Sequence, residues 1–215
     1  MIADRLAGGA PLSRPSPGER YVVLDFETTG LSARQGARVI EVSAREVVDG
    51  ELGEDFATLI DPGEPIPAFV SSLTGITDDM VRGAPTPGEI VPRLLAFIGE
   101  ATVVGHNIAF DTRFLHAEAQ RVELAFDRST LCTLLLSRRL FPGRTGYRLG
   151  GFVDELGLSL PARLHRASAD TYVTAHLFAA LRERVRLITG GRPVDFATLA
   201  WVQAMRLAAA RRLGG

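Results

Sequence analysis

The run Tyr21-Val22-Val23-Leu24-Asp25-Phe26-Glu27-Thr28-Thr29-Gly30 sets the first expectation for the structure of this chain. It begins with apolar, β-favouring residues, so it predicts a buried strand that opens the domain. Side chains alternate between the two faces of a strand, which places the carboxylates of Asp25 and Glu27 on one face. Their repulsion is costly unless a cation or a positive side chain compensates it. Taken alone, such a pair is more often a strand end with hydrated acids.

The residues after this run continue the pattern of a mixed sheet. Residues 39–48 and 51–60 predict two more strands, joined by a hairpin turn at Asp49-Gly50, which gives three antiparallel strands. Helical segments are expected at 68–73, 77–81 and 86–98, the last capped by Thr86, followed by a buried strand at 101–105. Further helices are predicted at 110–122, 130–140, 149–156 and 168–188, and from Asp195 to about residue 207. This order indicates an α/β fold with a mixed β-sheet flanked by α-helices.

The composition is that of a globular protein. Of 215 residues, 46% are hydrophobic and 23% are charged, which suffices for a sizeable core. No apolar run reaches the roughly 18 residues of a spanning helix, so no membrane partner is expected. Cys132 is the single cysteine, which excludes an intrachain disulfide and a cysteine-rich metal site. We expect a cytoplasmic protein with a flexible leader at 1–19, a single compact domain at 20–190 and a C-terminal helical extension at 191–215.

Charge is unevenly distributed along the chain, although the net charge is only −1. The part up to Asp111 has 8 arginines and 17 acidic residues, whereas the part from Thr112 has 16 arginines and 8 acidic residues. The acidic part holds candidate metal ligands. The basic part is suited to phosphates, because a guanidinium binds phosphate through two parallel hydrogen bonds. All 24 basic residues are arginine, which coding bias explains equally well, so charge only supports a nucleic-acid partner.

Two more segments carry residues suited to metal or proton chemistry. Asp111 is expected in the first turn of the helix after the fourth strand, where an acid also serves simply as a partner of the helix dipole. His165 is expected on a loop and Asp170 early in the next helix. They approach the same point if Ser168 or a neighbour caps that helix, and the histidine is then placed to accept a proton while the carboxylate holds a metal. Alone, His165 is as readily a plain surface histidine.

Taken together, these segments resemble a known family. In order, the segments Asp25-Phe26-Glu27-Thr28-Thr29-Gly30-Leu31, His106-Asn107 with Phe110-Asp111 and Phe114-Leu115, and His165-Arg166-Ala167 with Asp170 resemble the three exonuclease motifs of the DEDDh superfamily. The segments Leu73-Thr74-Gly75-Ile76-Thr77, Met80-Val81 and Leu131-Cys132-Thr133-Leu134 resemble those of the proofreading epsilon subunit of bacterial DNA polymerase III and its relatives. The likeness covers about residues 20–181. Thr171 is a departure, because relatives often carry alanine there, and we do not expect it to disturb metal binding.

The resemblance implies a ribonuclease H-like fold and a 3′–5′ exonuclease that releases nucleoside 5′-monophosphates from the 3′ end of DNA in proofreading or repair. The substrate would be a single-stranded or frayed 3′ end of DNA, or RNA, and a DNA polymerase subunit is a candidate partner. Two divalent cations, Mg²⁺ or Mn²⁺, about 4 Å apart, are implied, with His165 as the general base. Their implied ligands are Asp25, Glu27, Asp111 and Asp170. The implied substrate-binding residues are Thr28, Thr29, Leu31, Gly75, Ile76, His106 and Phe114.

Several alternatives stay open at this point. Leu31 and Phe114 are equally well explained by ordinary core packing. An RNA-trimming enzyme would use the same chemistry, and no residue predicts how the 2′-hydroxyl is handled. The chain would belong to another class if it were an inactive adapter that binds nucleic acid or a polymerase. Against that reading, all five chemical positions carry competent residues.

Overall fold

A five-stranded mixed sheet forms the centre of the computed structural model, which describes residues 19–48, 50–160 and 164–206. The strands β1 (Arg20–Thr28), β2 (Val39–Val48) and β3 (Glu51–Leu59) are antiparallel. β4 (Thr102–Gly105) lies parallel to β1, and β5 (Thr130–Cys132) lies parallel to β4. The order is β3-β2-β1-β4-β5, so the predicted α/β mixed sheet is confirmed. The predicted leader, apart from Glu19, and residues 207–215 of the predicted extension lie outside the described residues.

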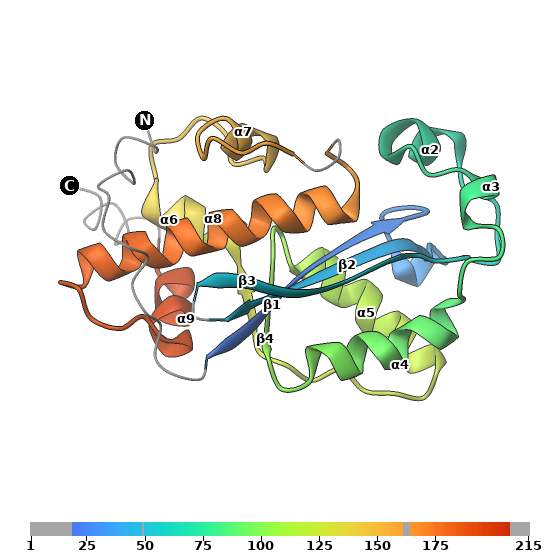
Figure 1. Cartoon of the computed structure of the whole chain (residues 1–215), viewed down its shortest axis with the longest axis horizontal. Helices are drawn as coiled ribbons and strands as arrows, with labels where there is room; N and C mark the ends of the chain where they lie inside the picture. Colours follow the sequence, from blue (N-terminus) through green and yellow to red (C-terminus); the bar gives the residue numbers. More distant parts are fainter. Residues whose placement is uncertain (1–18, 49, 161–163, 207–215) are drawn as a thin grey trace.

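Helices cover both faces of this sheet, as Figure 1 shows. On one face lie α8 (Ala167–Ile188), α6 (Thr133–Leu140), α7 (Gly150–Val153) and α9 (Phe196–Ala204). The other face carries α4 (Pro87–Ile98) and α5 (Ala109–Arg121). Three short helices, η1 (Ala33–Gln35), α2 (Ala68–Thr74) and α3 (Asp78–Val81), lie in the connections. The result is a three-layer arrangement in which β1, β2 and β4 are largely buried, whereas the edge strand β3 is mostly exposed.

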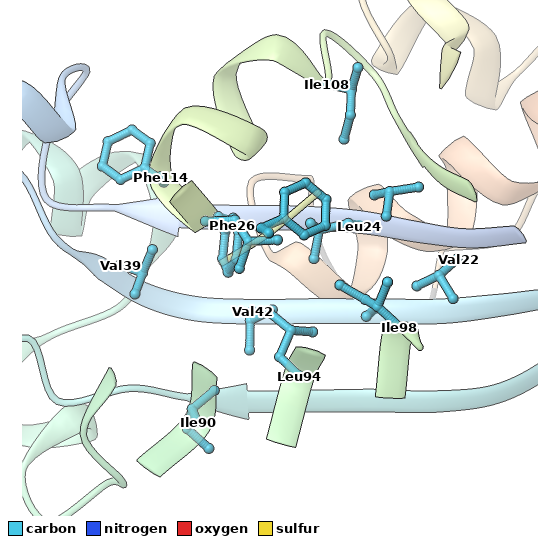
Figure 2. Packing of buried hydrophobic residues seen from close by; sticks show 14 of the residues in the cluster. Val22, Leu24, Phe26, Val39, Val42, Ile90, Leu94, Ile98, Ile108 and Phe114 are labelled. Carbon is cyan, nitrogen blue, oxygen red and sulfur yellow. The ribbon is translucent and has the colours of Figure 1, made fainter. Parts of the chain in front are cut away.

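The alternation of side chains along β1 assigns its apolar residues to two of the three core clusters among the described residues. Tyr21 and Val23 pack with α6, α8 and α9, whereas Val22, Leu24 and Phe26 pack with α4 and α5. Figure 2 shows the second cluster, in which Leu94 and Ile98 of α4 lie against Val22 and Val42. Since side chains two apart share a face, Asp25 and Glu27 project toward the layer of α8. The core thus fixes which helix faces the acidic pair.

Helix α9 packs on the domain at the edge of the sheet. Its start is as predicted, because the Oδ1 atom of Asp195 accepts a hydrogen bond from the backbone N of Thr198 at 2.8 Å. Leu199 and Val202 are buried in the cluster of α6 and α8. The side-chain oxygen of Gln203 accepts a hydrogen bond from the backbone N of Cys132 at 2.6 Å, which satisfies an N–H of the edge strand β5. The predicted division at residue 190 stays a prediction.

One secondary-structure prediction is wrong in part. Residues 130–132 were expected to begin a helix, but they form β5, and the helix starts at Thr133. Three residues are too few to show a strand period, and their pairing with β4 is a tertiary contact that local pattern does not contain. The predicted helix at 149–156 is shorter, at Gly150–Val153. Among the described residues, no helix is long and apolar enough to cross a membrane.

Candidate active site

The acidic pair lies where β1 extends beyond its parallel neighbour. β1 pairs with β4 only over residues 21–23, so Asp25 and Glu27 lie past the end of that pairing. The pairing with β2 shifts register between Glu27 and Thr28, and such bulges bend a strand and redirect its side chains. In open α/β sheets, ligands commonly bind at the carboxyl ends of the parallel strands. The topology of the sheet therefore indicates a ligand-binding site at the carboxyl end of β1.

Asp111 approaches the same strand from α5. Its Oδ1 atom accepts a hydrogen bond from the backbone N of Phe26 at 3.0 Å, between the two acidic residues of β1. Gly105 allows this approach, because a Cβ atom there would come within 2.6 Å of Cδ1 of Ile108, just before α5, and within 3.1 Å of the carbonyl oxygen of Leu24 on β1. Asp111 lies in the first turn of α5, as predicted, and is only 3% exposed. Asp111 therefore contacts β1 directly, in addition to lying at the start of the helix dipole.

His165 and Asp170 reach the site from the start of α8. The Oδ2 atom of Asp170 accepts a hydrogen bond from the backbone N of His165 at 3.2 Å. His165 has a φ of 63°, in the left-handed region that a residue with a Cβ atom rarely adopts and that is common at functional sites. One potential ligand atom from each of Glu27, His165 and Asp170 lies within 4.8 Å of the other two. Strand, loop and helix thus converge on one point.

Burial and mutual repulsion raise the pKa of all four carboxyl groups. The pKa of Asp25 lies well above its ordinary value, because of burial first and then the charges of Asp111, Asp170, Glu27 and Glu41. Burial is also the largest cause that raises the pKa of Glu27 to about 8, of Asp111 to about 7 and of Asp170 to about 6. Four such acids can be ionised together only if positive charge is supplied. The carboxylate donors therefore fit a hard divalent cation such as Mg²⁺ or Mn²⁺.

A fifth acid, Glu41, lies beside this site, and the sequence reasoning missed it. Glu41 of β2 stands opposite Glu27 in the strand register and is 6% exposed. Its Oε1 atom lies 2.6 Å from Nη2 of Arg166, and its Oε2 atom accepts a hydrogen bond from the backbone N of Ala167 at 2.9 Å. The sequence left the cap of α8 to Ser168 or a neighbour; the N-cap residue is Arg166, which makes no side-chain cap hydrogen bond, and Glu41 supplies a carboxylate at the start of the helix instead. The available signal was an acid inside the apolar run Val39-Ile40-Glu41-Val42.

Thr171, the departure from the family pattern, is committed to contacts away from the carboxylates. Its Oγ1 atom lies 2.7 Å from Oγ of Ser43 on β2 and donates to the carbonyl oxygen of Ala167 within α8. Both Ser43 and Thr171 are buried. The threonine therefore adds a contact between α8 and β2.

The residues predicted to bind substrate fall into two groups. Leu31 is 84% exposed and lines a shallow cavity of about 430 Å³ together with Thr29. The side chain of Thr28 donates to the carbonyl oxygen of Gly30 at 2.7 Å, and that of Thr29 donates to Glu64 at 2.9 Å. In contrast, Ile76 and Phe114 are 0% and 1% exposed and belong to the core, as Figure 2 shows for Phe114. Gly75, with a φ of 77°, ends α2 in a conformation that favours glycine.

Both ring nitrogens of His106 have partners within the protein. Its Nδ1 atom lies 2.9 Å from Oγ1 of Thr133, and its Nε2 atom lies 2.8 Å from the carbonyl oxygen of Tyr147. Burial lowers its pKa, which favours the neutral ring. The ring borders a cavity of about 750 Å³ whose lining includes His106, Arg138, Tyr147, Arg148, His165 and Asp170. A contact of His106 with substrate would therefore be made by the ring edge, since both nitrogens have partners.

The comparisons with known proteins agree with this geometry. The RNase_T family model, described as Exonuclease, matches residues 22–178. The chain is 36% identical over 166 residues to the DNA polymerase III subunit epsilon of Aquifex aeolicus. The aligned region covers 77% of this chain and 81% of the relative. It is 36% identical over 159 residues to the PolC-type DNA polymerase III of Clostridium perfringens, which covers 74% of this chain. The chain spans only 11% of the length of that PolC-type relative.

A solved structure shows the same architecture. Exonuclease X in complex with 5′-overhanging duplex DNA superposes with a TM-score of 0.67 at 26% identity, covering 86% of this chain and 99% of that one. The mixed sheet and its helices therefore have the ribonuclease H-like arrangement that the motifs implied. With a family model that matches most of the chain and relatives above 30% identity, this chain belongs to the exonuclease family.

Proposed function

We propose that this nuclease is a metal-dependent 3′–5′ exonuclease that releases nucleoside 5′-monophosphates from the 3′ end of DNA in the cytoplasm. The observation that carries the proposal is the convergence of β1, α5 and the start of α8 on one point. The residues brought together are Asp25, Glu27, Asp111, His165 and Asp170. They are the five residues that the family resemblance assigns to the chemistry.

The four carboxylates would hold two divalent cations. Asp25 lies near the other acids, since the charges of Asp111, Asp170 and Glu27 all raise its pKa, and by the family resemblance it would serve both ions. Glu27 and Asp170 would hold the first ion, and Asp111 would support the second. When bound, the cations neutralise the acids and stabilise the charge that develops on the attacking and leaving oxygens of an in-line displacement.

His165 is placed to act as the general base. A ring nitrogen of an imidazole can accept a proton from water, and the exposed position of His165 allows that proton to pass to solvent. The carboxylate of Asp170 would stabilise the protonated ring, because the charge of His165 lowers the pKa of Asp170 against the effect of burial. The backbone hydrogen bond between the same two residues keeps the loop in place.

The surroundings of the site suit a nucleic-acid strand. The exposed Leu31 and the backbone of Thr28 and Thr29 would contact the terminal nucleotide. The cavity beside His165 carries the exposed guanidinium groups of Arg138 and Arg148, which would bind phosphates of the preceding nucleotides. Such contacts hold a backbone without reading base edges, so we expect little sequence preference. Relatives of this chain are named as DNA polymerase III proteins, so a DNA polymerase is a candidate partner and proofreading a candidate role.

A degradation assay tests this proposal. Single-stranded DNA, a duplex with a mismatched 3′ end and RNA, each labelled at the 3′ or the 5′ end, would be incubated with Mg²⁺, Mn²⁺ or EDTA. We expect mononucleotides from the 3′-labelled DNA, a shrinking ladder from the 5′-labelled DNA, and no reaction in EDTA. Release of the 5′ label first, or equal activity in EDTA, would contradict the proposal. Degradation of RNA but not of DNA would make the chain an RNA-trimming enzyme.

A further inference from the structure

A carboxylate of β2 holds the first turn of α8 in place. The Oε2 atom of Glu41 accepts a hydrogen bond from the backbone N of Ala167, the first residue of the helix, at 2.9 Å. A helix start has free N–H groups and a partial positive charge, so an acid at this position stabilises it. Asp170 lies in the same turn. The contact therefore sets where the turn that carries Asp170 lies relative to the sheet.

The same carboxylate holds the residue after His165. The Oε1 atom of Glu41 lies 2.6 Å from Nη2 and 3.1 Å from Nε of Arg166. On the other side of the loop, Asp170 accepts a hydrogen bond from the backbone N of His165. A left-handed backbone at a residue with a Cβ atom persists only when the surrounding contacts enforce it. The loop is thus held by Asp170 at the backbone of His165 and by Glu41 at the next two residues, Arg166 and Ala167.

Arg166 also compensates the charge of Glu41. Glu41 stands opposite Glu27 in the strand register, and like charges at opposed positions destabilise a sheet. The guanidinium of Arg166 makes a close ion pair with Glu41 and opposes the effects that raise the pKa of Glu27. Arg166 therefore offsets part of the charge that Glu41 adds beside the metal-binding acids, while Glu41 holds the start of α8.

From these contacts we infer that Glu41 and Arg166 are positioning residues, which hold the His165 loop and Asp170 over the carboxylates of β1. This inference rests on the proposed exonuclease function and extends it to two residues that touch neither the substrate nor a cation. The contact of Ser43 with Thr171 reinforces the arrangement, one turn further along α8.

Kinetics of Glu41→Gln and Arg166→Gln on single-stranded DNA test this inference. We expect kcat to fall by about 10- to 100-fold, the usual effect of removing a residue that orients a metal ligand, with KM within about 2-fold of wild type. Mn²⁺ binding measured by calorimetry should weaken by about 10-fold in Glu41→Gln. The kcat of the double variant should be no more than about 3-fold below that of the less active single variant, because the two residues act as a unit. Arg166→Lys should restore part of kcat, since it keeps the charge and loses the planar fork.

Glu46→Gln is the matched control, because Glu46 is also on β2, is partly buried and pairs with an arginine, Arg20, which bonds to carbonyl oxygens of α4. It should lower the melting temperature and leave kcat of the folded protein unchanged. A kcat for folded Glu41→Gln and Arg166→Gln within about 2-fold of the Glu46→Gln value would overturn the inference, because a purely structural pair lowers stability alone. Wild-type protein that degrades no nucleic acid would overturn the proposed function as well, so the two failures are distinguishable.

Discussion

Replacing Glu27 by glutamine is expected to stabilise the metal-free protein while it removes activity. In the folded chain the pKa of Glu27 is about 8, against an ordinary 4.5, with burial as the largest cause. The folded state therefore keeps a proton that the unfolded chain loses, and stability falls as pH rises from about 4.5 through 8. Each pKa unit corresponds to about 1.4 kcal/mol, which gives an upper bound of about 5 kcal/mol. Because the site is partly exposed, solvent screening reduces the expected destabilisation by Glu27 to about 1–2 kcal/mol.

Thermal melts in EDTA would measure this effect. For a domain of this size, 1–2 kcal/mol corresponds to a rise of about 3–6 °C for Glu27→Gln at pH 8, and the difference should vanish near pH 4.5. Glu54→Gln, an exposed acid on β3, is the control and should not change the melting temperature. Mg²⁺ at pH 8 should stabilise wild type more than Glu27→Gln. A variant that melts at or below wild type at pH 8, or an offset that does not depend on pH, would refute the reasoning.

Three other substitutions probe separate parts of the structure. His165→Ala should lower kcat by about 100- to 10,000-fold and keep Mn²⁺ binding in calorimetry, because the histidine moves a proton and the carboxylates hold the metal; equal loss of both would be inconsistent with a general base. Arg148→Ala should weaken the binding of single-stranded DNA and reduce the slope of log affinity against log salt concentration by about 1. An unchanged slope would show that Arg148 does not contact a phosphate. Leu199→Ala should lower the free energy of unfolding in denaturant by about 2–5 kcal/mol, because Leu199 is fully buried between α9 and the domain. A change below about 0.5 kcal/mol would show that α9 does not stabilise the fold.

The sequence predicted the parts of the structure that depend on local pattern. β1 was recognisable because its apolar run is bounded by a glycine, and the hairpin of β2 and β3 because of its turn residues. The cap of α9 by Asp195 follows a rule that involves residues three apart. The acids and the histidine were found because each motif is contiguous, although their convergence rested on the family resemblance.

The parts that the sequence did not predict depend on contacts between distant residues. Glu41 meets Arg166 across 125 positions of the chain, and no local rule connects an acid in a strand with the start of a later helix. β5 exists because it pairs with β4, and the three residues alone read as the beginning of a helix. His106 looked like a substrate residue by family position, and only the coordinates show that both its nitrogens have partners in Thr133 and Tyr147.

The most informative measurement is mononucleotide release from a 3′-labelled single strand in Mg²⁺ by wild type and by Asp25→Ala, with both proteins shown to be folded by circular dichroism. The charges of Asp111, Asp170, Glu27 and Glu41 all raise the pKa of Asp25, and Asp25 is the residue proposed to serve both cations. We predict rapid release of labelled 5′-monophosphate by wild type and none above background by the folded variant. Release by Asp25→Ala at the wild-type rate would contradict the assignment of this carboxylate cluster as the active site.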